Sequence, residues 1–402
     1  MRQVEVEKVT HSNADAKALV RRALRHRKNG TTDQAESQMR LPVTSYTDAE
    51  QFRNEVERIY HRLPIAAALS LDLPEPGSYM AEDIMGRPVL LTRDKAGKVH
   101  AQLNVCRHRG AVICPSGRGK KTRFSCPYHS WTYDNQGNLI GVYGEQSFGP
   151  INRDELALTR LNCEERFGII WLCLTPSIQF DIDAWIGDMA GPLQSLELEN
   201  WELYEQRTIP GPGWKATLDG YLEVYHHDTV HGKTVGQYTI GNLLVHDTFG
   251  PHQRLTFGRK NLDELDGVPM EDWDDPHEYI RIIHSIFPNL SVSGIVGGHC
   301  LVSQVSPGKG PETTTTRQSI LCAKGGKDEA WHLAAKQFSE MTLQAVRDED
   351  YSVVATIQHA LNSGANNSFL IGRNEPGVQH YHRAVAAAMD GTLSGLNAVS
   401  EG

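Results

Sequence analysis

Two short stretches, Cys106-Arg-His108 and Cys126-Pro-Tyr-His129, decide the fold of the front half of this 402-residue chain. Each stretch supplies one cysteine and one histidine, and 17 residues separate His108 from Cys126. Thiolates and imidazoles are side chains that bind transition metals well. The pattern CxH-x17-CxxH therefore predicts a metal centre held between two tight loops.

Two kinds of metal centre use two cysteines with two histidines. In a Rieske [2Fe-2S] cluster, two histidines replace two cysteines on one iron and raise the reduction potential to roughly −150 to +300 mV. A structural zinc site takes the same residue types, but zinc modules usually begin with paired cysteines and end with paired histidines. Each half of this motif mixes the two types. The spacing thus favours a Rieske cluster held by Cys106, His108, Cys126 and His129.

Composition limits what the rest of the chain can be. The length favours two or more domains, and the apolar fraction of 39% suffices for ordinary globular cores. A formal net charge of −9 argues against a nucleic-acid partner, and no run of 18 apolar residues suggests a membrane span. Seven scattered cysteines are too few for a disulfide scaffold, which favours a reducing, cytoplasmic location.

Hydrophobic periodicity divides the chain into three predicted regions. Residues 1–60 form a charged leader that ends in an amphipathic helix over 48–60. Residues 61–175 contain short alternating segments, typical of a small all-β domain around the cluster motif. Residues 176–402 mix strands with helices and predict an α+β domain with a central antiparallel sheet, on which we expect the leader to pack.

Four segments carry the prediction for the larger domain. Residues 290–296, 299–305 and 314–323 are expected to be strands, because apolar and β-branched residues dominate them. Residues 327–362 have a helical repeat and predict one long helix or two abutting helices.

The segment 220–231, GYLEVYHHDTVH, is the best candidate for a second metal site. It holds three histidines and two carboxylates. Non-haem Fe(II) oxygenases hold iron with two histidines and one carboxylate and leave positions open. On an ideal helix, His227 and His231 share a face at i, i+4, so spacing alone would choose that pair. The pair His226 and His231, at i, i+5, requires a π-type bulge or a helix end between them.

A distant carboxylate must complete such a site, and the run Asp348-Glu349-Asp350 is the candidate. Asp350 shares a helical stripe with Leu343, Val346, Val353, Val354, Ile357 and Leu361. A carboxylate on an apolar face is costly unless it is paired or bound to metal. Asp350 is thus the predicted third ligand, with a buried salt bridge as the alternative. Asp348 and Glu349 lie off the stripe and are expected in solvent.

The motif sequences CRHRG (106–110) and CPYHSW (126–131) resemble the Rieske non-haem iron aromatic-ring-hydroxylating oxygenases, at their large (alpha) catalytic subunit. The resemblance covers roughly residues 45–385, including GRNEPGVQHYHR at 372–383. It implies a Rieske [2Fe-2S] domain followed by a helix-grip-like catalytic domain with one mononuclear Fe(II).

The resemblance also assigns the second site. In this family an acidic residue is followed at +3 and +8 by the two iron-binding histidines, and Glu223, His226 and His231 match that spacing. Asp350 resembles the carboxylate ligand. Glu223 is then the bridging catalytic residue, which hydrogen-bonds His226 and the cluster ligand His129 of a neighbouring subunit. Such head-to-tail contacts imply a ring, as a homotrimer (alpha3) or alpha3beta3.

The implied function is that of a terminal oxygenase, which uses O2 and two electrons to mono- or cis-dihydroxylate an aromatic or other apolar organic substrate. Oxidative attack on an alkylamine or quaternary ammonium compound is the alternative, and Glu at position 223 leans slightly towards it. The chain has no dinucleotide-binding motif, so a separate NAD(P)H-dependent reductase, directly or through a ferredoxin, must deliver the electrons.

Other observations keep the prediction open. Gly213 and Leu218-Asp219 depart from the family pattern near the iron, which leaves the substrate undetermined. Two non-enzyme classes compete with the oxygenase. One is a Rieske electron-transfer protein without mononuclear iron, and the other is a zinc-organised interaction module.

Overall fold

The computed structural model describes residues 13–326 and 328–401, apart from the side chains of 13, 294–296 and 401. Chain contacts divide it into two compact units. One contains the residues up to Val56 and Ile186–Gly395, and the other contains Glu57–Trp185 and Leu396–Gly402. The predicted regions 1–60, 61–175 and 176–402 stay a prediction about functional domains. The last strand, β22 (Val399–Glu401), pairs with β13 (Ile178–Phe180) and so belongs to the second unit.

The second unit consists mainly of short antiparallel strands. Its five-stranded sheet has the order β10-β5-β4-β3-β6, with β10 Arg160–Leu161, β5 Val99–Leu103, β4 Arg87–Arg93, β3 Ser78–Ile84 and β6 Gly117–Lys120. A three-stranded sheet has the order β11-β12-β2, with β11 Cys163–Arg166, β12 Ile169–Leu172 and β2 Ile65–Leu69. A second three-stranded sheet contains β7 Arg123–Ser125, β8 Thr132–Asp134 and β9 Leu139–Gly141. The small, mostly β domain expected around the cluster motif is therefore confirmed.

Two strands of this unit deliver the cluster motif. Strand β5 ends at Leu103, shortly before Cys106, and β7 ends at Ser125, directly before Cys126. Each cysteine thus lies where a chain leaves a sheet and begins a turn, and the sheets fix where the two turns begin.

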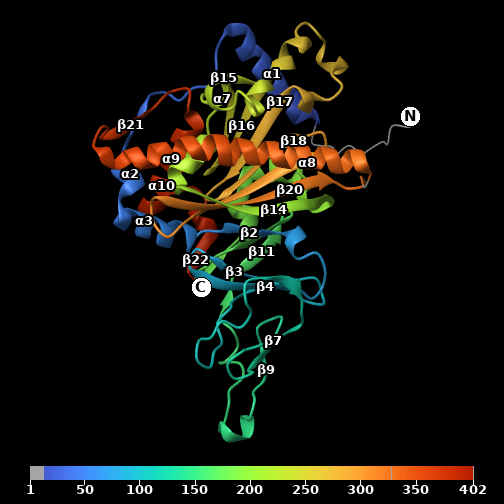
Figure 1. Cartoon of the computed structure of the whole chain (residues 1–402), viewed down its shortest axis with the longest axis vertical. Helices are drawn as coiled ribbons and strands as arrows, with labels where there is room; N and C mark the ends of the chain where they lie inside the picture. The colour runs from blue at the N-terminus through green and yellow to red at the C-terminus, as the bar shows by residue number, and fades with distance from the viewer. Residues whose placement is uncertain (1–12, 327, 402) are drawn as a thin grey trace. The chain divides into compact units, whose positions relative to one another are not determined.

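The first unit is built on a seven-stranded antiparallel sheet (Figure 1). Its order is β14-β20-β19-β18-β17-β16-β15, with β14 Trp201–Pro212, β20 Thr313–Ala323, β19 His299–Pro307, β18 Leu290–Val296, β17 Ile280–Ile286, β16 His252–Arg259 and β15 Thr239–Phe249. The predicted α+β class with a central antiparallel sheet is confirmed. The three predicted strands are found as β18, β19 and β20.

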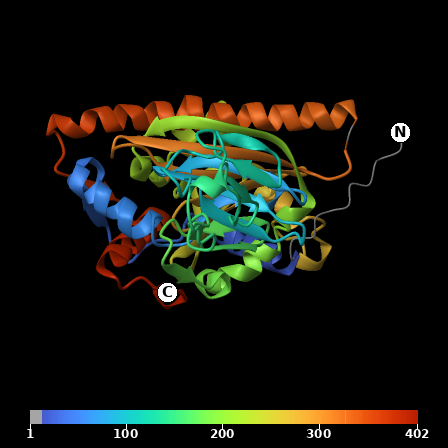
Figure 2. The ribbon, with the colours of Figure 1, turned by 90° about the horizontal axis from the view of Figure 1, so that it is seen from below.

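One long helical rod runs along this sheet (Figures 1 and 2). It consists of α8 (Glu329–Leu343), a π-helical segment (Gln344–Asp350) and α9 (Tyr351–Ala360). Phe338 of α8 packs with Leu301 and Ile320 of the sheet, and this apolar contact holds the rod in place. The predicted long helix is confirmed, but its register changes within the π segment.

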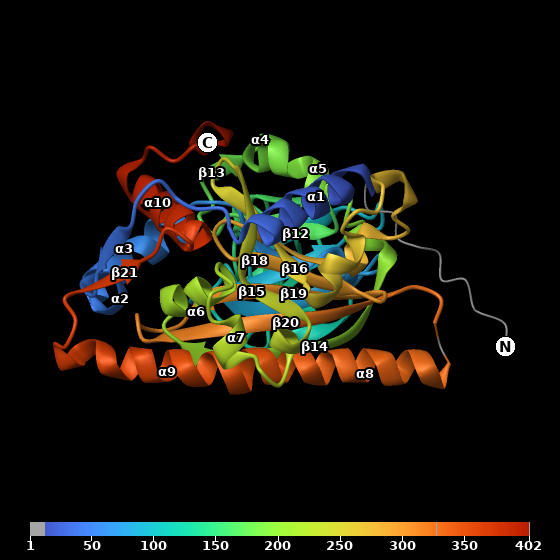
Figure 3. The same cartoon turned by 90° about the horizontal axis from the view of Figure 1, so that it is seen from above.

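The other face of the sheet carries α1 (Asn13–Asn29) and α10 (Pro376–Asp390), which lie across the sheet from the rod (Figure 3). Leu19 of α1 packs against Val245 and Ile280. The remaining regular elements of this unit include β1 Met39–Pro42 paired with β21 Ser368–Ile371, and the helices α2 Thr44–Thr47, α3 Ala49–Glu55, α5 Ala190–Gln194, α6 Trp214–Tyr221 and α7 His227–Val230. None of the helices in the described chain is long and apolar enough to cross a bilayer.

A buried ion pair joins the leader to α6. The Lys215 side chain is 4% exposed and that of Glu55 1% exposed, and Lys215 Nζ donates to the Glu55 carboxylate and to the Ser45 carbonyl. Burial lowers the pKa of Lys215, while the charge of Glu55 opposes this change. The pair therefore compensates two charges that would each be costly alone.

We expect Lys215→Met to destabilise the first unit by about 3–5 kcal/mol, because it leaves the buried Glu55 carboxylate without a counter-charge. Calorimetric unfolding of the purified chain measures the shift. The double variant Lys215→Met/Glu55→Leu removes both charges and should be more stable than either single variant. Equal losses in the single and double variants would show that the charges are not the reason.

Candidate metal centres

The two cysteine–histidine pairs lie on loops of the same construction. The Cys106 N–H donates to the Ala111 carbonyl, and the Gly110 N–H donates back to the Cys106 carbonyl. In the second loop, the Cys126 N–H donates to the Trp131 carbonyl, and the Ser130 N–H donates back to the Cys126 carbonyl. Gly110 and Ser130 occupy the same loop position with φ of 77° and 56°. Both loops therefore turn through one left-handed residue and present their side chains in the same manner.

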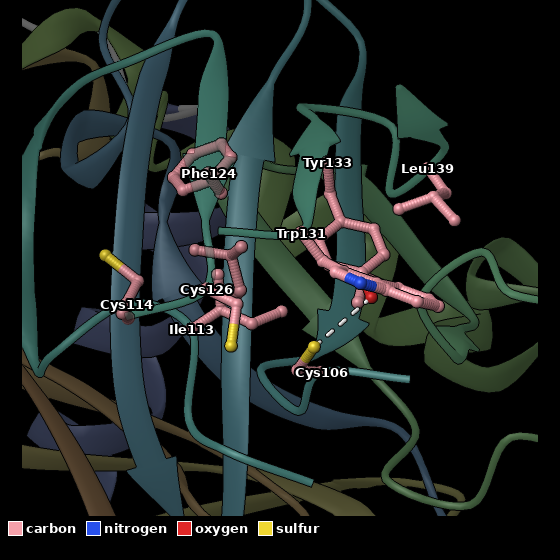
Figure 4. Close-up of a cluster of buried hydrophobic side chains, with 11 residues drawn as sticks. Cys106, Ile113, Cys114, Phe124, Cys126, Trp131, Tyr133 and Leu139 are labelled. Atoms are coloured by element: carbon pink, nitrogen blue, oxygen red, sulfur yellow. Dashed lines mark hydrogen bonds between the residues drawn. The ribbon is translucent and has the colours of Figure 1, made fainter. Parts of the chain in front are cut away.

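The thiols of both loops are buried in one apolar cluster. Cys106 and Cys126 are each 3% exposed and belong to the buried group that includes Phe124 and Trp131 (Figure 4). The Tyr133 hydroxyl accepts the Arg107 N–H at 3.1 Å and lies 3.5 Å from Cys106 Sγ. A tyrosine hydroxyl beside a cysteine sulfur fits a hydrogen bond to a thiolate ligand.

The two histidines come together from opposite loops. The ring centroids of His108 and His129 are 4.7 Å apart, and His108 stacks on Trp131 at 4.9 Å. His108 Nδ1 is buried and lacks a hydrogen-bond partner among the described residues. Burial, followed by the charges of His129 and Arg109, lowers the pKa of His108 and favours the neutral ring that metal binding requires. Two buried thiols and an unsatisfied imidazole nitrogen therefore fit the predicted cluster.

Three side chains of the first unit converge on a second point. His226 Nε2 lies 3.1 Å from His231 Nε2. Asp350 Oδ1 lies 3.5 Å from His226 Nε2 and 3.0 Å from His231 Nε2. Helix α7 begins after His226 and ends before His231, so the break in helical structure that an i, i+5 pair requires is present. Asp350 is the last residue of the π segment, a distortion often found at functional sites.

His227 lies close to this point but faces differently. Its Nδ1 lies 3.3 Å from Thr239 Oγ1, and its ring meets Phe257 edge to face at 5.3 Å. Ligand atoms of His226, His227 and His231 all lie within 4.8 Å of one another, so proximity alone does not choose the pair. The position of Asp350 supports the predicted pair His226 and His231, because its Oδ1 lies near those two rings and forms no ion pair with His227 among the described residues.

The carboxylates around His226 and His231 favour a positive charge at this site, either on the histidines or on a bound cation. Burial alone would lower the pKa of His226, but the carboxylates of Asp350 and Glu223 outweigh it and raise the pKa to about 10. Burial would raise the pKa of Asp350, but hydrogen bonds from His226 and His231 lower it. A partly buried cluster with excess negative charge is suited to a divalent cation.

Glu223 fixes the orientation of His226. Its carboxylate accepts the Nδ1 hydrogen of His226 together with the backbone N–H groups of Tyr225 and His226. With Nδ1 engaged, Nε2 is the nitrogen that remains free to face Asp350. Such a carboxylate–histidine pair fixes both the tautomer and the ring orientation of a metal ligand.

Glu349 corrects the prediction from periodicity, which placed it in solvent. Its side chain is 12% exposed and accepts a hydrogen bond from His231 Nδ1 at 2.7 Å and another from Thr234 Oγ1. The widened turn of the π segment brings it to the inner face beside Asp350. Asp348 is exposed and pairs with Arg347, as expected. The sequence offered one indication of this contact: Glu349 is a second carboxylate directly before Asp350, the predicted ligand.

The stripe used to choose Asp350 is only partly buried. Val346, Val354 and Leu361 are buried, but Val353 and Ile357 are 42% and 40% exposed, contrary to expectation. Both exposed residues line an open cavity of about 460 Å³ that also touches Glu223, His226 and Asp350. A surface hollow, not a closed core, therefore accounts for that part of the apolar pattern.

Comparison with known proteins matches both units. Residues 64–150 match the family described as "Rieske [2Fe-2S] domain", and residues 198–391 match "Ring hydroxylating alpha subunit (catalytic domain)". Together these matches cover more than half of the chain. The chain belongs to the Rieske oxygenase alpha subunits. Its two domains are of the kinds that bind a [2Fe-2S] cluster and a mononuclear iron.

Relatives of this Rieske oxygenase chain include the glycine betaine monooxygenase oxygenase subunit of Pseudomonas aeruginosa, 30% identical over 48% of this chain and 44% of the relative. The corresponding subunit of Chromohalobacter salexigens is 27% identical over 81% of this chain and 80% of that relative. The chain thus spans about half the length of several curated relatives that it matches.

Two solved structures share its fold. A quaternary ammonium Rieske monooxygenase with L-carnitine has a TM-score of 0.75 at 21% identity, covering 89% of this chain and 96% of that one. Naphthalene 1,2-dioxygenase from Rhodococcus sp. has a TM-score of 0.72 at 18% identity, covering 94% of this chain and 99% of the other. At these identities the likeness establishes the architecture of the Rieske oxygenase chain.

We expect Glu349→Gln to weaken iron binding by about 10–100-fold, because a neutral amide is a poorer partner for His231 Nδ1. Iron retained during a chelator titration measures the effect, and the visible spectrum monitors the Rieske cluster. Asp348→Asn is the matched control, since Asp348 is exposed and pairs only with Arg347 among the described groups. If both variants lose iron equally, local charge and not the hydrogen bond to His231 is responsible.

Proposed function

We propose that this chain is the terminal oxygenase of a multicomponent Rieske system. Cys106, His108, Cys126 and His129 would hold the cluster, and His226, His231 and Asp350 would hold Fe(II). When bound, these groups would supply electrons and activate O2 for hydroxylation of an organic substrate. The observation that carries the proposal is the convergence of two imidazole nitrogens and one carboxylate oxygen, within 3.5 Å, beside a cavity.

The protein's own groups position the donors and give the site an apolar lining. Glu223 and Glu349 each hold the Nδ1 side of one histidine, so that the two Nε2 atoms face Asp350. Apolar side chains, including Val346 and Leu301, line the smaller of two cavities at this point. A preorganised site with an apolar lining suits oxygen chemistry on an unactivated C–H bond.

We place the docking of a second copy of this chain at the larger cavity. Glu223 lines it, and Val353, Ile357 and the 50%-exposed Leu370 give it an apolar rim. In the cluster unit, exposed Tyr128 stacks on His129 at 3.7 Å. An apolar rim around a carboxylate fits an aromatic surface that ends in a cluster histidine. This supports Glu223 as the bridge between subunits in a homotrimer or alpha3beta3 assembly.

Electrons would come from a separate NAD(P)H-dependent reductase, directly or through a ferredoxin. All seven cysteines are unpaired, which supports a reducing, cytoplasmic location. His108 and His129 are both partly exposed, which supports electron transfer to the cluster from an external protein.

Two substrate branches follow from the relatives. Glycine betaine and carnitine monooxygenase subunits support monooxygenation of a quaternary ammonium compound. The biphenyl 2,3-dioxygenase alpha subunit of Rhodococcus jostii, 33% identical over 37% of this chain, supports cis-dihydroxylation of an aromatic substrate. The greater coverage of the first group makes monooxygenation the favoured branch and aromatic dihydroxylation the second candidate.

The test is product screening by mass spectrometry with a reductase, NADH and 18O2. The substrate panel should contain quaternary ammonium compounds, N-methylated ureas and aromatic compounds. Incorporation of one labelled atom identifies monooxygenation, and two labelled atoms in one product identify dihydroxylation. Protein that contains both metals but consumes no oxygen with any class would contradict the proposal.

A further inference from the structure

Arg281 is a charged residue, the second of β17, the strand with sequence IRIIHSI. Side chains alternate between the two faces of a strand. Ile280 and Ile282 pack on the face that carries α1. Arg281 and Ile283 therefore face the other way, towards the rod that carries Asp350, where both line the smaller cavity.

This cavity of about 100 Å³ lies directly at the predicted iron ligands. His226, His231 and Asp350 line one side of it. The sheet forms the opposite side, where Arg281 lies across from Phe257 in the strand register. A cavity of this size admits several waters or a compact organic molecule. Arg281 therefore lines the same cavity as the metal donors.

The guanidinium of Arg281 has no counter-charge. No described carboxylate forms an ion pair or hydrogen bond with it, and Asp350, in the same cavity, is engaged by the two histidines. Burial, and then the positive charge of Arg259, lowers the pKa of Arg281 to about 10, so it stays protonated at neutral pH. A partly buried guanidinium that faces a cavity and has no counter-charge is suited to bind an anionic ligand.

We propose that Arg281 binds a carboxylate of the substrate, so that this oxygenase acts on an organic acid. The proposal rests on the proposed function, whose substrate class it narrows. A guanidinium matches a carboxylate with two parallel hydrogen bonds, which fixes orientation as well as position.

The rest of the cavity fits the body of such an acid. Apart from the metal donors, its lining includes Phe257, Ile283, Leu301 and Val346. An acid held by Arg281 on the sheet would direct its remaining carbon atoms towards His226, His231 and Asp350 on the facing side. Because Arg281 lies on a central strand and not on a loop, it is a rigid anchor.

The test measures binding, not turnover. Isothermal titration of the metal-loaded protein compares two pairs of probes, benzoate with benzamide and glycine betaine with choline, in which only one member carries a carboxylate. We expect the acid of at least one pair to bind at least about 10-fold more tightly than its partner. Arg281→Gln should lower the affinity for that acid by about 100-fold and leave its partner unchanged.

Two further variants complete the design. Arg259→Gln is the matched control, because Arg259 is also a cation of the same sheet but does not line the cavity; it should keep the preference for the acid. Arg281→Lys retains the charge without the bidentate geometry and should retain part of the preference. If Arg281→Gln does not fold, the preference for the acid is compared between wild type and Arg281→Lys, and a weaker preference in Arg281→Lys supports the proposal.

The proposal fails if no acid binds more tightly than its partner, or if Arg281 variants match Arg259→Gln. Failure of the proposed function has a different signature. Protein without mononuclear iron, or without oxygen consumption, would reject the oxygenase while an Arg281-dependent preference for acids persists. An acid preference without iron would thus still assign Arg281 as a carboxylate site.

Discussion

We expect His226→Ala to remove the mononuclear iron and to leave the Rieske cluster in place. Total iron is expected to fall from about three to about two atoms per chain, since the cluster itself holds two. Oxygen-coupled turnover should fall by at least about 1000-fold, equivalent to roughly 4 kcal/mol in the activation barrier. The reason is geometric: His231 and Asp350 alone supply two of the three converging donor atoms. Iron analysis and the visible spectrum of the purified variant measure both parts of the prediction.

His227→Ala is the matched control for this prediction. It removes an adjacent imidazole whose Nδ1 lies against Thr239 and not against Asp350. Iron content should stay near that of the wild type. Full mononuclear iron in His226→Ala, combined with its loss in His227→Ala, would reverse the ligand assignment and favour the i, i+4 pair.

Glu223→Gln is expected to keep both metals and to lose turnover by about 100-fold or more. The amide can still contact His226, but it lacks the negative charge that holds the Nδ1 hydrogen and would bridge to the cluster histidine of a second copy. Reoxidation of the pre-reduced cluster by oxygen and substrate, followed in a stopped-flow experiment, should slow by a similar factor. A loss of overall turnover without slower cluster oxidation would argue against the bridge.

Two controls separate bridging from a general effect of charge. Asp228→Asn changes an exposed carboxylate on the adjacent α7 and should be nearly silent. Mixed assemblies of Cys126→Ser chains with His226→Ala chains should recover part of the turnover, since the cluster of one chain would serve the iron of another. Near-normal coupled turnover of Glu223→Gln, or mixtures without recovery, would remove Glu223 from the electron path.

The cluster loops could be predicted from the sequence because the chemistry is local. Cys106 and His108, like Cys126 and His129, lie within one turn of each other, so the spacing alone indicates that each pair can contact one metal centre. The histidine pair predicted to bind iron was harder to choose, because spacing on an ideal helix favoured His227 and only the family pattern selected His226. The break at α7 that reconciles the two is set by tertiary packing.

The contacts that could not be predicted from the sequence depend on an irregular backbone, on the orientation of a strand, or on residues far apart in the chain. Glu349 reaches His231 because the π segment shifts the helical register, which a 3.6-residue period does not represent. Arg281 is conspicuous in an isoleucine-rich strand, but the sequence does not show which face of β17 lies towards the rod and therefore does not indicate a role for Arg281. The Lys215–Glu55 pair joins residues 160 positions apart and has no local signature.

The central claim is that one chain holds both a Rieske cluster and a separate ferrous ion at His226, His231 and Asp350. Nitric oxide titration of anaerobically reduced protein, followed by EPR, tests it most directly. We predict the signal of a reduced Rieske cluster together with about one equivalent per chain of a nitrosyl signal from mononuclear iron, of which only the nitrosyl signal disappears in His226→Ala. Wild-type protein with a complete cluster but no nitrosyl signal, or a His226→Ala variant that retains it, would contradict the account.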